Sequence, residues 1–481
     1  MLQSASTPPP EQESSAESFP AAESIAEDLR EGLYQFLRPL LVLLDAVMDV
    51  RLVRTLHDTV AAILCFRNRS LGLLLSELGA YLLSPEHAPA GTKRLSNLLR
   101  SDKWQPKLLH DWLWQQATRQ KQALTEMGED TLALWDESVV EKPESRNSEG
   151  LCPVRSAKAK RLARSCPGPD SGKPTFVQGL HWVALLLIGR SGPPTVAAMR
   201  WFTTRGPKAT DLRAVQAQIL KRCALAWGRS VLHVFDRGYA GAAWLWSCLM
   251  EDVRFLIRWP KGRYLVDADG KEMPAWQIAR GQRSWEERIA WDAVQNKPRR
   301  IGILALLVRH PGPNPGASQQ EGGEGQYLSC PPLWLVIARP GDGKEPWYLL
   351  TNDPIQNGDD AWRIVLAYAR RWQIEMCFRY NKSELGLESP RLWTWERREK
   401  LLLIVTLCYA FLLSLLAEEL TTLRLWLLRH FCHRTGKRQR DRTQNAQSLS
   451  AAPLYRLRSA ISRLWLAYPE SSLPSVSQSS G

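Results

Sequence analysis

The chain has 481 residues, enough for two to four domains, and carries 63 Lys and Arg against 49 Asp and Glu, a formal charge of +14. This excess favours a polyanionic partner over a small neutral substrate. The nine cysteines are odd in number, scattered and without a Cys-x-x-Cys pair, which excludes a disulfide scaffold and argues against a zinc site.

Residues 1–29 are rich in Ser, Pro and Glu, and the first basic residue is Arg30. A signal peptide would begin with a basic segment followed by an apolar one, and this stretch has neither. Its composition cannot bury enough apolar surface to offset the cost of ordering. We therefore expect a disordered acidic tail.

Residues 30–128 form the next segment. The stretches "LRPLLVLLDAVMDV", "LHDTVAAILCF" and "SLGLLLSELGAYLL" repeat apolar residues at helical spacing. A basic amphipathic stretch, "TKRLSNLLRSDKW", follows them. The pattern predicts an α-helical domain, which is either a DNA-contacting module or a plain helical support.

The pattern changes at residue 129. "DTLALWD" (130–136) and "SVLHVFD" (230–236) are apolar strands that each end on an acid. Between them, "GLHWVALLLIG" and "PTVAAMRWFTT" predict two strands joined by a Gly/Pro turn, followed by the helix "LRAVQAQILKRCALAW". The helix "AAWLWSCLM" and the strand "VRFLIRW" close the segment. This α/β order fits a ribonuclease-H-like mixed sheet over residues 129–259.

The remaining segments interrupt or complete this core. Residues 141–176 are predicted to be a polar loop with a basic centre, "VRSAKAKRLARS", which either touches a polyanion or is solvated. Residues 260–351 hold strand-like runs around a Gly-rich loop and predict a β-rich insertion, after which residues 352–430 return to the core. Residues 431–481 are predicted to be a basic tail with a short helix and a Ser-rich end.

Two features tempt other interpretations. The apolar run 401–416 is shorter than the roughly 18 residues that a membrane span needs, and it leads directly into Glu418 and Glu419. A buried core helix is the better interpretation. Cys432 and His433 lie near His430 but lack a second cysteine pair, so they do not predict a metal site.

The stretch "YARRWQIEMCFRYNK" (368–382) has the length of one helix. On that helix, Tyr368, Arg371, Glu375 and Lys382 would share an arc of about 60°, between apolar shoulders. Such a narrow ionic stripe suggests a partly buried helix that delivers a carboxylate and cations to a cleft. The alternative is an ordinary pair between Arg371 and Glu375 on a surface helix.

Three acids lie on suitable elements for a shared site. Asp136 and Asp236 each end an apolar strand, and Glu375 projects from the helix; Asp130 and Glu137 are the alternatives to Asp136. Carboxylate oxygens suit Mg²⁺, and a pair of such ions can activate an attacking hydroxyl and stabilise a leaving oxygen. We therefore expect two Mg²⁺ ions, for which Mn²⁺ could substitute.

The spacing of Tyr368, Arg371, Glu375 and Lys382 resembles the Y-(2)-R-(3)-E-(6)-K signature of the DDE transposases of bacterial insertion sequences, in particular the group that moves by cut-and-paste through a DNA hairpin. "FDRGY" (235–239) and "LALWDES" (132–138) are similar to the regions around that group's two catalytic aspartates. The β-rich insertion before the glutamate is also that group's layout. The resemblance covers roughly 130–415.

The resemblance implies residue roles. Asp136, Asp236 and Glu375 would be the catalytic, metal-binding triad. Tyr368, Arg371 and Lys382 would contact phosphates near the cleaved DNA end. Trp347, in "EPWYLLTND", would stack on a base flipped out during hairpin formation, and its alternative is an ordinary strand aromatic. Arg237 is either a phosphate contact or a structural salt bridge.

This resemblance implies a transposase that cleaves double-stranded transposon ends and joins them to target DNA. Two rivals stay open: a ribonuclease-H-like nuclease that does not join strands, and a domesticated DNA-binding protein. We expect a homodimer in the DNA complex, no membrane partner, and a cytoplasmic protein that is nucleoid-associated when bound to DNA.

Overall fold

The computed structural model of the protein describes residues 2–4, 22–66, 72–145, 147–165, 173–292, 297–312, 330–341, 343–431 and 451–469. The chain divides into two compact units. Unit 1 comprises Met1–Pro9, Leu113–Val139 and His181–Met376, and unit 2 comprises Pro10–Trp112, Val140–Leu180 and Cys377–Gly481. The six predicted segments are a different division and stay predictions.

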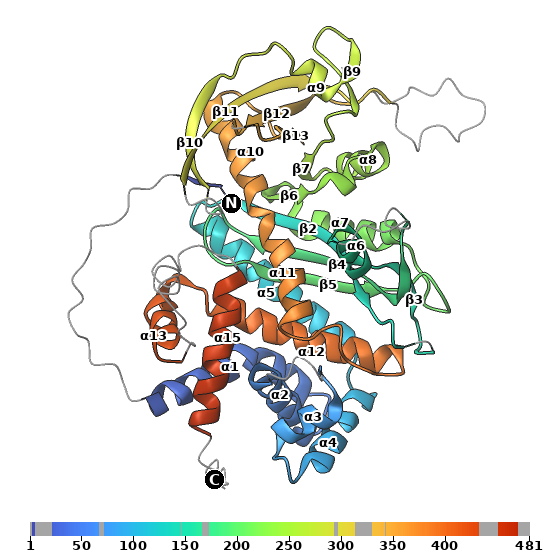
Figure 1. The fold of residues 1–481 in the computed structure, drawn as a ribbon, viewed down its shortest axis with the longest axis vertical. Coiled ribbons are helices and arrows are strands. Elements are labelled where there is room, and N and C mark those ends of the chain that lie inside the picture. Colours follow the sequence, from blue (N-terminus) through green and yellow to red (C-terminus); the bar gives the residue numbers. More distant parts are fainter. Residues whose placement is uncertain are drawn as a thin grey trace, which may run out of the picture. The chain divides into compact units, whose positions relative to one another are not determined.

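Unit 2 is largely helical. Helix α2 lies at its centre and packs against α1, α3, α4, α12 and α15 (Figure 1). The helices are α1 (Ala22–Asp45), α2 (Val50–Cys65), α3 (Leu75–Leu82), α4 (Ala88–Arg100), α12 (Trp395–Ser414), α13 (Thr421–Phe431) and α15 (Ala451–Ala467). Helix α5 (Pro106–Glu126) begins in unit 2 and continues into unit 1. The helical prediction for this part of the sequence therefore describes the observed elements well.

Both predicted tails contain structured parts. Helix α1 begins at Ala22 rather than near residue 30, because Ile25, Ala26 and Leu29 are buried and extend its apolar face. Residues Leu2–Ser4 form strand β1, which pairs with β10. At the other end, the short helix predicted within residues 431–481 is α15, which buries Leu457 and other apolar residues in unit 2. The basic run after residue 431 lies outside the described residues.

The sheet is mixed and, in the described part of the chain, has eleven strands in the order β1-β10-β11-β12-β13-β7-β6-β2-β4-β3, with β5 on β4 (Figure 1). The core strands are β2 (Thr131–Glu141), β4 (Phe176–Ile188), β5 (Thr195–Phe202), β6 (Val231–Phe235) and β7 (Arg254–Arg258). Strands β2, β6 and β7 are parallel, and β4 and β5 form an antiparallel hairpin. The predicted fold class, a mixed α/β sheet with an N-terminal helical region, is confirmed.

The parallel strands are joined by the helices that the sequence predicts. Helix α7 (Leu212–Trp227) precedes β6, and α8 (Ala242–Met250) connects β6 to β7. The strands themselves are buried on both sides, as expected in the centre of a covered sheet. A side-chain hydrogen bond joins β2 to β6, because the indole N–H of Trp135 donates to Nδ1 of His233 at 2.9 Å. Burial lowers the pKa of His233 to about 3, which keeps this ring neutral and able to accept.

The insertion extends the same sheet. Its long strands are β10 (Glu286–Asp292), β11 (Lys297–Val308), β12 (Leu333–Arg339) and β13 (Trp347–Thr351), each antiparallel to the next. Strand β13 pairs with core strand β7 through Leu349 and Arg258, which lie opposite each other. A separate hairpin contains β8 (Tyr264–Val266) and β9 (Glu272–Pro274). Most of the predicted Gly-rich loop lies outside the described residues.

The polar loop predicted at 141–176 contains two short elements in unit 2, strand β3 (Cys152–Arg155) and helix α6 (Ala157–Ser165). Strand β3 pairs with the first residues of β4, which explains why this segment is extended rather than irregular. Residues 146 and 166–172 lie outside the described part. The loop prediction is therefore wrong for residues 152–165.

The stretch 368–382 is not one helix. Helix α10 (Gly358–Arg370) ends before Arg371, and α11 (Trp372–Ser383) begins after it. Around the junction, the N–H of Arg371 donates to the carbonyl of Tyr368 at 3.0 Å, and the N–H of Ile374 donates to the carbonyl of Arg371 at 3.1 Å. These i to i+3 bonds form a tighter turn than an α-helix. Tyr368 and Glu375 therefore lie on two consecutive helices.

Helix α12 contains most of the apolar run 401–416, and its residues 401–409 and 411–413 are buried in unit 2, as predicted for a core helix. No single described helix is long and apolar enough to cross a membrane, and one bent pair, Trp395–Ser414 with Glu418–Phe431, meets the length and composition test only when taken together.

Candidate active site

The first acid, Asp136, lies within strand β2 rather than at its end. The strand continues to Glu141, five residues beyond the predicted limit. Leu134 of β2 is paired with Val234 of β6 in parallel register. Two residues further along both strands, this register brings Asp136 level with Asp236, which directly follows β6. The sheet thus places the two predicted aspartates side by side.

The second acid, Asp236, begins the short 3-10 turn Arg237–Tyr239. Its Oδ1 atom accepts a hydrogen bond from the backbone N–H of Gly238. Tyr239 is buried below this turn, and the guanidinium of Arg213 lies over its ring at 5.8 Å. The residues Gly238 and Tyr239 therefore fix the turn that orients the Asp236 carboxylate.

The third acid, Glu375, lies in the first turn of α11 and meets the two aspartates through one cation. Arg371 places Nη1 at 3.1 Å from Oδ2 of Asp136 and at 4.0 Å from Oδ2 of Asp236. Its Nη2 atom donates to Oε1 of Glu375. The Arg371 side chain is only 11% exposed. Three acids from separate elements of unit 1 thus converge on one buried guanidinium.

Burial and charge act in opposite directions on this cluster. Burial raises the pKa of Asp136 to about 7, the Arg371 guanidinium lowers it, and the neighbouring carboxylates of Asp236 and Glu375 raise it. Burial also disfavours the charged form of Arg371, but Tyr368 and the three acids outweigh that effect and raise its pKa. The site therefore needs a cation, and Arg371 supplies it.

The donor set suits a divalent metal ion, because carboxylate oxygens are the ligands that Mg²⁺ prefers. Within the described residues, no group of three or more His, Cys, Asp or Glu side chains lies close enough to hold an ion. The guanidinium of Arg371 contacts all three carboxylates and occupies the place where they converge. The donor chemistry of the three carboxylates fits a divalent cation, and an ion bound where they converge would displace Arg371.

An aromatic and cationic group adjoins the acids. The ring of Tyr368 lies 5.9 Å from the Arg371 guanidinium, and its other neighbour is the ring of Trp347, at 5.3 Å and edge-to-face. Trp347 is the first residue of β13. A chain of contacts therefore runs from Trp347 through Tyr368 to the cation that holds the acids, and the base-stacking role of Trp347 stays a prediction.

Arg258 is a residue that the sequence interpretation missed. It is the last residue of β7, and its guanidinium lies 5.6 Å from the ring of Trp347 and 5.7 Å from that of Tyr368. Its Nη2 atom donates to the carbonyl of Pro346 at 3.0 Å, while Nη1 has no hydrogen-bond partner among the described residues. Arg258 is only 7% exposed, and burial lowers its pKa to about 10. The sequence feature that could have indicated Arg258 is an apolar strand, β7, that ends on a cation. In the sheet this strand lies beside β6, which Asp236 follows.

The alternatives to Asp136 lie in other surroundings. Asp130 pairs with Arg190 at 2.7 Å and with Arg363 at 3.6 Å, in an ion-pair network away from Arg371. Glu137 follows Asp136 on the strand, so its side chain points to the opposite face, where it accepts from Gln216 at 3.4 Å. The geometry favours Asp136.

The two remaining predicted residues differ in placement. Arg237 is exposed next to Asp236 and makes no ion pair within the described part of the chain, so nothing there supports its structural alternative. Lys382 lies seven residues after Glu375 on α11 but belongs to unit 2. There it pairs with Glu388 at 3.8 Å. The roles of both in DNA binding stay predictions.

Comparison with known proteins supplies the family. Residues 189–411 match the family described as a transposase DDE domain, a range that includes Asp236 and Glu375. No curated protein matches the chain. Among solved structures, the chain is similar to a cryo-EM structure of the piggyBac transposase synaptic complex with hairpin DNA, with 11% identity, 95% of this chain and 87% of that chain covered, and a TM-score of 0.36.

The family match coincides with the elements that bring two of the three acids to Arg371, and the members of this family use divalent metal ions. The resemblance to DDE transposases that the spacing of Tyr368, Arg371, Glu375 and Lys382 predicts is thereby confirmed, and the assignment to the hairpin group stays a prediction. The chain carries a DDE transposase domain over residues 189–411.

Proposed function

We propose that the protein is a DNA transposase that cleaves transposon ends and joins them to target DNA by metal-dependent phosphoryl transfer. The observation that carries this proposal is the convergence of Asp136, Asp236 and Glu375 on the guanidinium of Arg371. Within this cluster Asp136 and Arg371 are largely withdrawn from solvent, at 18% and 11% exposed, and desolvating such charges costs several kcal/mol per ion, so the pair gains little stability from its position. Asp236, Arg371 and Glu375 lie within the matched DDE domain, which gives the cluster a chemical purpose.

The three acids would hold two Mg²⁺ ions, or Mn²⁺ in their place. When bound, such ions activate an attacking hydroxyl and stabilise the leaving oxygen in phosphoryl transfer. The chain itself sets the positions of the acids. The parallel register of β2 and β6 aligns Asp136 with Asp236, and the N–H of Gly238 orients the Asp236 carboxylate.

The cations around the acids would bind the DNA backbone. Arg371, once it has left the carboxylates, can reach a phosphate, and a guanidinium matches the geometry of phosphate oxygens. Tyr368 and Arg258 lie against each other at 5.7 Å and would form the neighbouring part of the same phosphate-binding surface. Arg237 is exposed beside Asp236 and would add one further contact.

We further propose that cleavage proceeds through a DNA hairpin and that Trp347 stacks on a base flipped out at that step. Closing a DNA end on itself leaves a base without a stacking partner, and an aromatic ring offsets this by about 1–3 kcal/mol. Trp347 contacts Tyr368 and Arg258, so its ring is held in place before DNA binds. Two ends must be cleaved and joined, so we propose a homodimer in the DNA complex, acting at the nucleoid in the cytoplasm.

The test is a strand-transfer assay with the full chain. The DNA that flanks the coding region is searched for inverted repeats, and a paired-end substrate built from them is incubated with target DNA and Mg²⁺. We expect end cleavage, a hairpin species and joined product. Cleavage without joining would assign the protein to the nuclease class, and binding without cleavage would make it a domesticated DNA-binding protein.

A further inference from the structure

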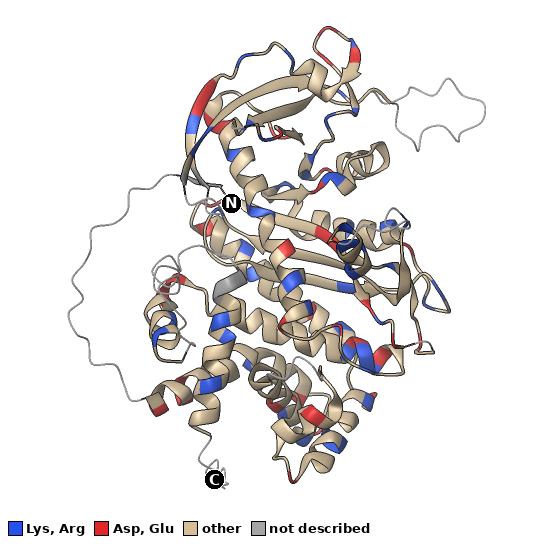
Figure 2. Ribbon diagram, in the orientation of Figure 1, with Lys and Arg blue, Asp and Glu red and all other residues tan. Residues whose placement is uncertain are grey.

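Helix α6 is an unusual element of unit 2. It carries Lys158, Lys160, Arg161 and Arg164 within nine residues and has no acidic residue (Figure 2). None of its residues is buried. A nine-residue helix is marginal in water when it gains nothing from packing. Burial of its side chains therefore does not explain why α6 is helical.

The charges of α6 oppose its own folding. Lys160 and Arg164 are four positions apart, and Arg161 and Arg164 are three apart, so each pair lies on one side of the helix. Like charges at these spacings destabilise a helix by about 0.2–0.5 kcal/mol per pair. A polyanion bound along the helix would remove this repulsion.

The protein holds the start of α6 in place from outside the helix. Glu141, the last residue of β2, is buried and accepts hydrogen bonds from the hydroxyl of Ser156 and the N–H of Ala157, both at 2.8 Å. The hydroxyl of Ser156 in turn accepts from the N–H of Ala159 at 3.0 Å. These bonds satisfy helix donors that would otherwise lack partners. The basic helix α6, none of whose residues is buried, is thus held at its N-terminus by the buried carboxylate of Glu141.

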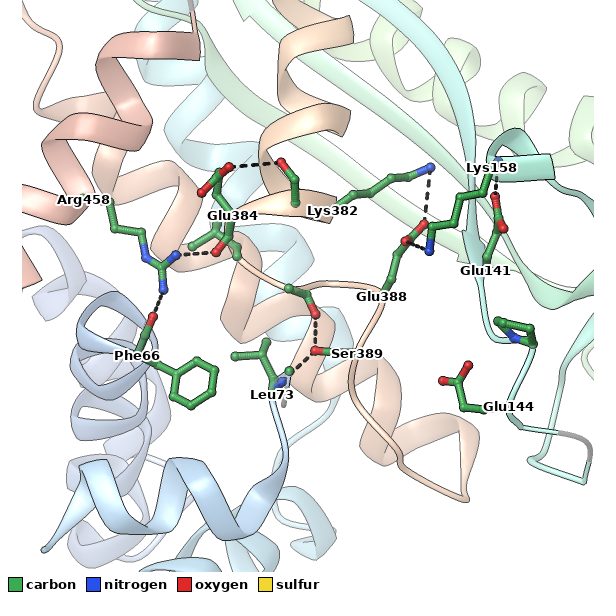
Figure 3. A pocket seen from close by; sticks show the side chains of 15 residues that line it. Phe66, Leu73, Glu141, Glu144, Lys158, Lys382, Glu384, Glu388, Ser389 and Arg458 are labelled. Carbon is green, nitrogen blue, oxygen red and sulfur yellow. Dashed lines mark hydrogen bonds and ion pairs between the residues drawn. The ribbon is translucent and has the colours of Figure 1, made fainter. Parts of the chain in front are cut away.

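Helix α6 also lies beside Lys382. Glu388 pairs with Lys158 at 2.7 Å and with Lys382 at 3.8 Å, and all three side chains line a cavity of about 270 Å³ (Figure 3). Burial lowers the pKa of Lys382, the charges of Glu388 and Glu141 raise it, and those of Lys158 and Arg161 lower it again. The α6 cations are thus neighbours of Lys382 within one unit.

We infer that α6 is a docking surface for the backbone of duplex DNA and that it continues the phosphate contacts predicted for Lys382. We call Lys160, Arg161 and Arg164 the α6 basic face; all three are exposed. Lys158 stays paired with Glu388 and holds α6 beside Lys382. The inference rests on the proposed function, because it assumes that DNA is the polyanion. It adds a DNA contact outside the DDE signature.

The test compares the full chain with the variant Lys160→Ala/Arg161→Ala/Arg164→Ala. Alanine favours the helix and none of these positions is buried, so a loss of binding cannot come from unfolding of α6. Binding of a fluorescent duplex is measured by anisotropy over a range of salt concentrations. We expect the slope of log K against log salt to flatten by about two to three units and affinity to fall on the order of 10²-fold or more at about 0.1 M salt.

Two matched variants control for net charge and side-chain shape. Lys221→Ala/Arg229→Ala/Lys271→Ala removes three exposed cations from unit 1, and we expect its slope to stay close to that of the wild type. Lys160→Arg/Arg161→Lys/Arg164→Lys keeps the charge and should retain binding. An unchanged slope in the α6 alanine variant, or an equal change in the unit 1 variant, would overturn the inference.

The assay also separates this inference from the proposed function. A wild-type chain that binds no duplex would overturn both, whereas binding without a contribution from α6 overturns only the docking surface. Vesicles of phosphatidylcholine and phosphatidylserine provide a second polyanion. If the alanine variant loses vesicle binding while its DNA slope is unchanged, the helix contacts lipid and the assignment to DNA is wrong.

Discussion

Arg371 and Asp136 lie 235 residues apart in the sequence, yet Nη1 of the arginine is 3.1 Å from Oδ2 of the aspartate. The same guanidinium contacts Asp236 and Glu375, so one side chain pairs with all three acids and offsets part of their negative charge. This relationship makes Arg371 a resident cation in the position that a divalent metal would take. Metal binding should therefore displace Arg371 from the acids. The displaced guanidinium would then be available to bind a phosphate.

The first prediction concerns metal affinity. Arg371→Gln removes the resident cation and leaves three carboxylates that repel one another, so the variant should bind Mn²⁺ more tightly than the wild type. Its complex with transposon-end DNA should be weaker, and the salt slope should flatten by about one unit for one lost phosphate contact. Calorimetry with Mn²⁺ alone and DNA titrations over salt measure the two effects. Unchanged metal affinity would return Arg371 to the role of a structural ion pair.

The second prediction concerns pH. Burial raises the pKa of Asp136 to about 7, so below that pH a proton occupies the carboxyl that a metal needs. Metal affinity should rise by up to about tenfold per pH unit below 7 and level off above it, with about one proton released on binding. Calorimetry in buffers of different ionisation enthalpy counts that proton. Affinity that is flat between about pH 6 and pH 8 would contradict this prediction.

A third prediction concerns Trp347. Trp347→Ala should let nicked DNA accumulate while hairpin and double-strand products fall, because the first hydrolysis needs no stacking platform. Trp347→Phe keeps an aromatic ring and should retain most hairpin formation. Gel analysis of strand cleavage over time distinguishes the steps. If nicking and hairpin formation drop together, Trp347 serves only to pack against Tyr368 and Arg258.

The fourth prediction concerns stability. Burial lowers the pKa of His233 to about 3, so as pH falls below about 6.5 the unfolded chain takes up a proton that the folded chain cannot. This residue alone should then cost up to about 1.4 kcal/mol of stability per pH unit, and above pH 6.5 it costs nothing. His233→Gln keeps an acceptor for Trp135 and lacks the titration. Its Tm should therefore fall less than that of the wild type between about pH 7.5 and about pH 5, and equal falls would refute the assignment.

Local signals were enough to predict the core of the fold. Apolar runs that alternate with helices predicted the strands of Asp136 and Asp236, and helices α7 and α8 have the predicted limits. The end of β2 was misjudged because polar residues follow Asp136, and pairing in the sheet overrides their weak strand preference.

The break at Arg371 had no signal in the sequence. Residues 368–382 contain no Gly or Pro, so helical periodicity predicts an unbroken helix. The break accompanies a tertiary contact, since Arg371 binds an aspartate from a distant strand. Periodicity alone cannot report such a contact. Arg258 was not predicted for a different reason: a cation at the end of an apolar strand cannot be a metal ligand, and its contacts with Trp347 and Tyr368 form only in the folded protein.

The central claim is that Asp136, Asp236 and Glu375 form one metal-binding catalytic set. The most direct measurement is strand cleavage of transposon-end DNA by Asp136→Ala, Asp236→Ala and Glu375→Ala, each assayed in Mg²⁺ and in Mn²⁺ alongside specific DNA binding. We predict that every variant loses cleavage with both ions while retaining most of its DNA binding. Cleavage retained by any one of them would remove that residue from the set and contradict the account.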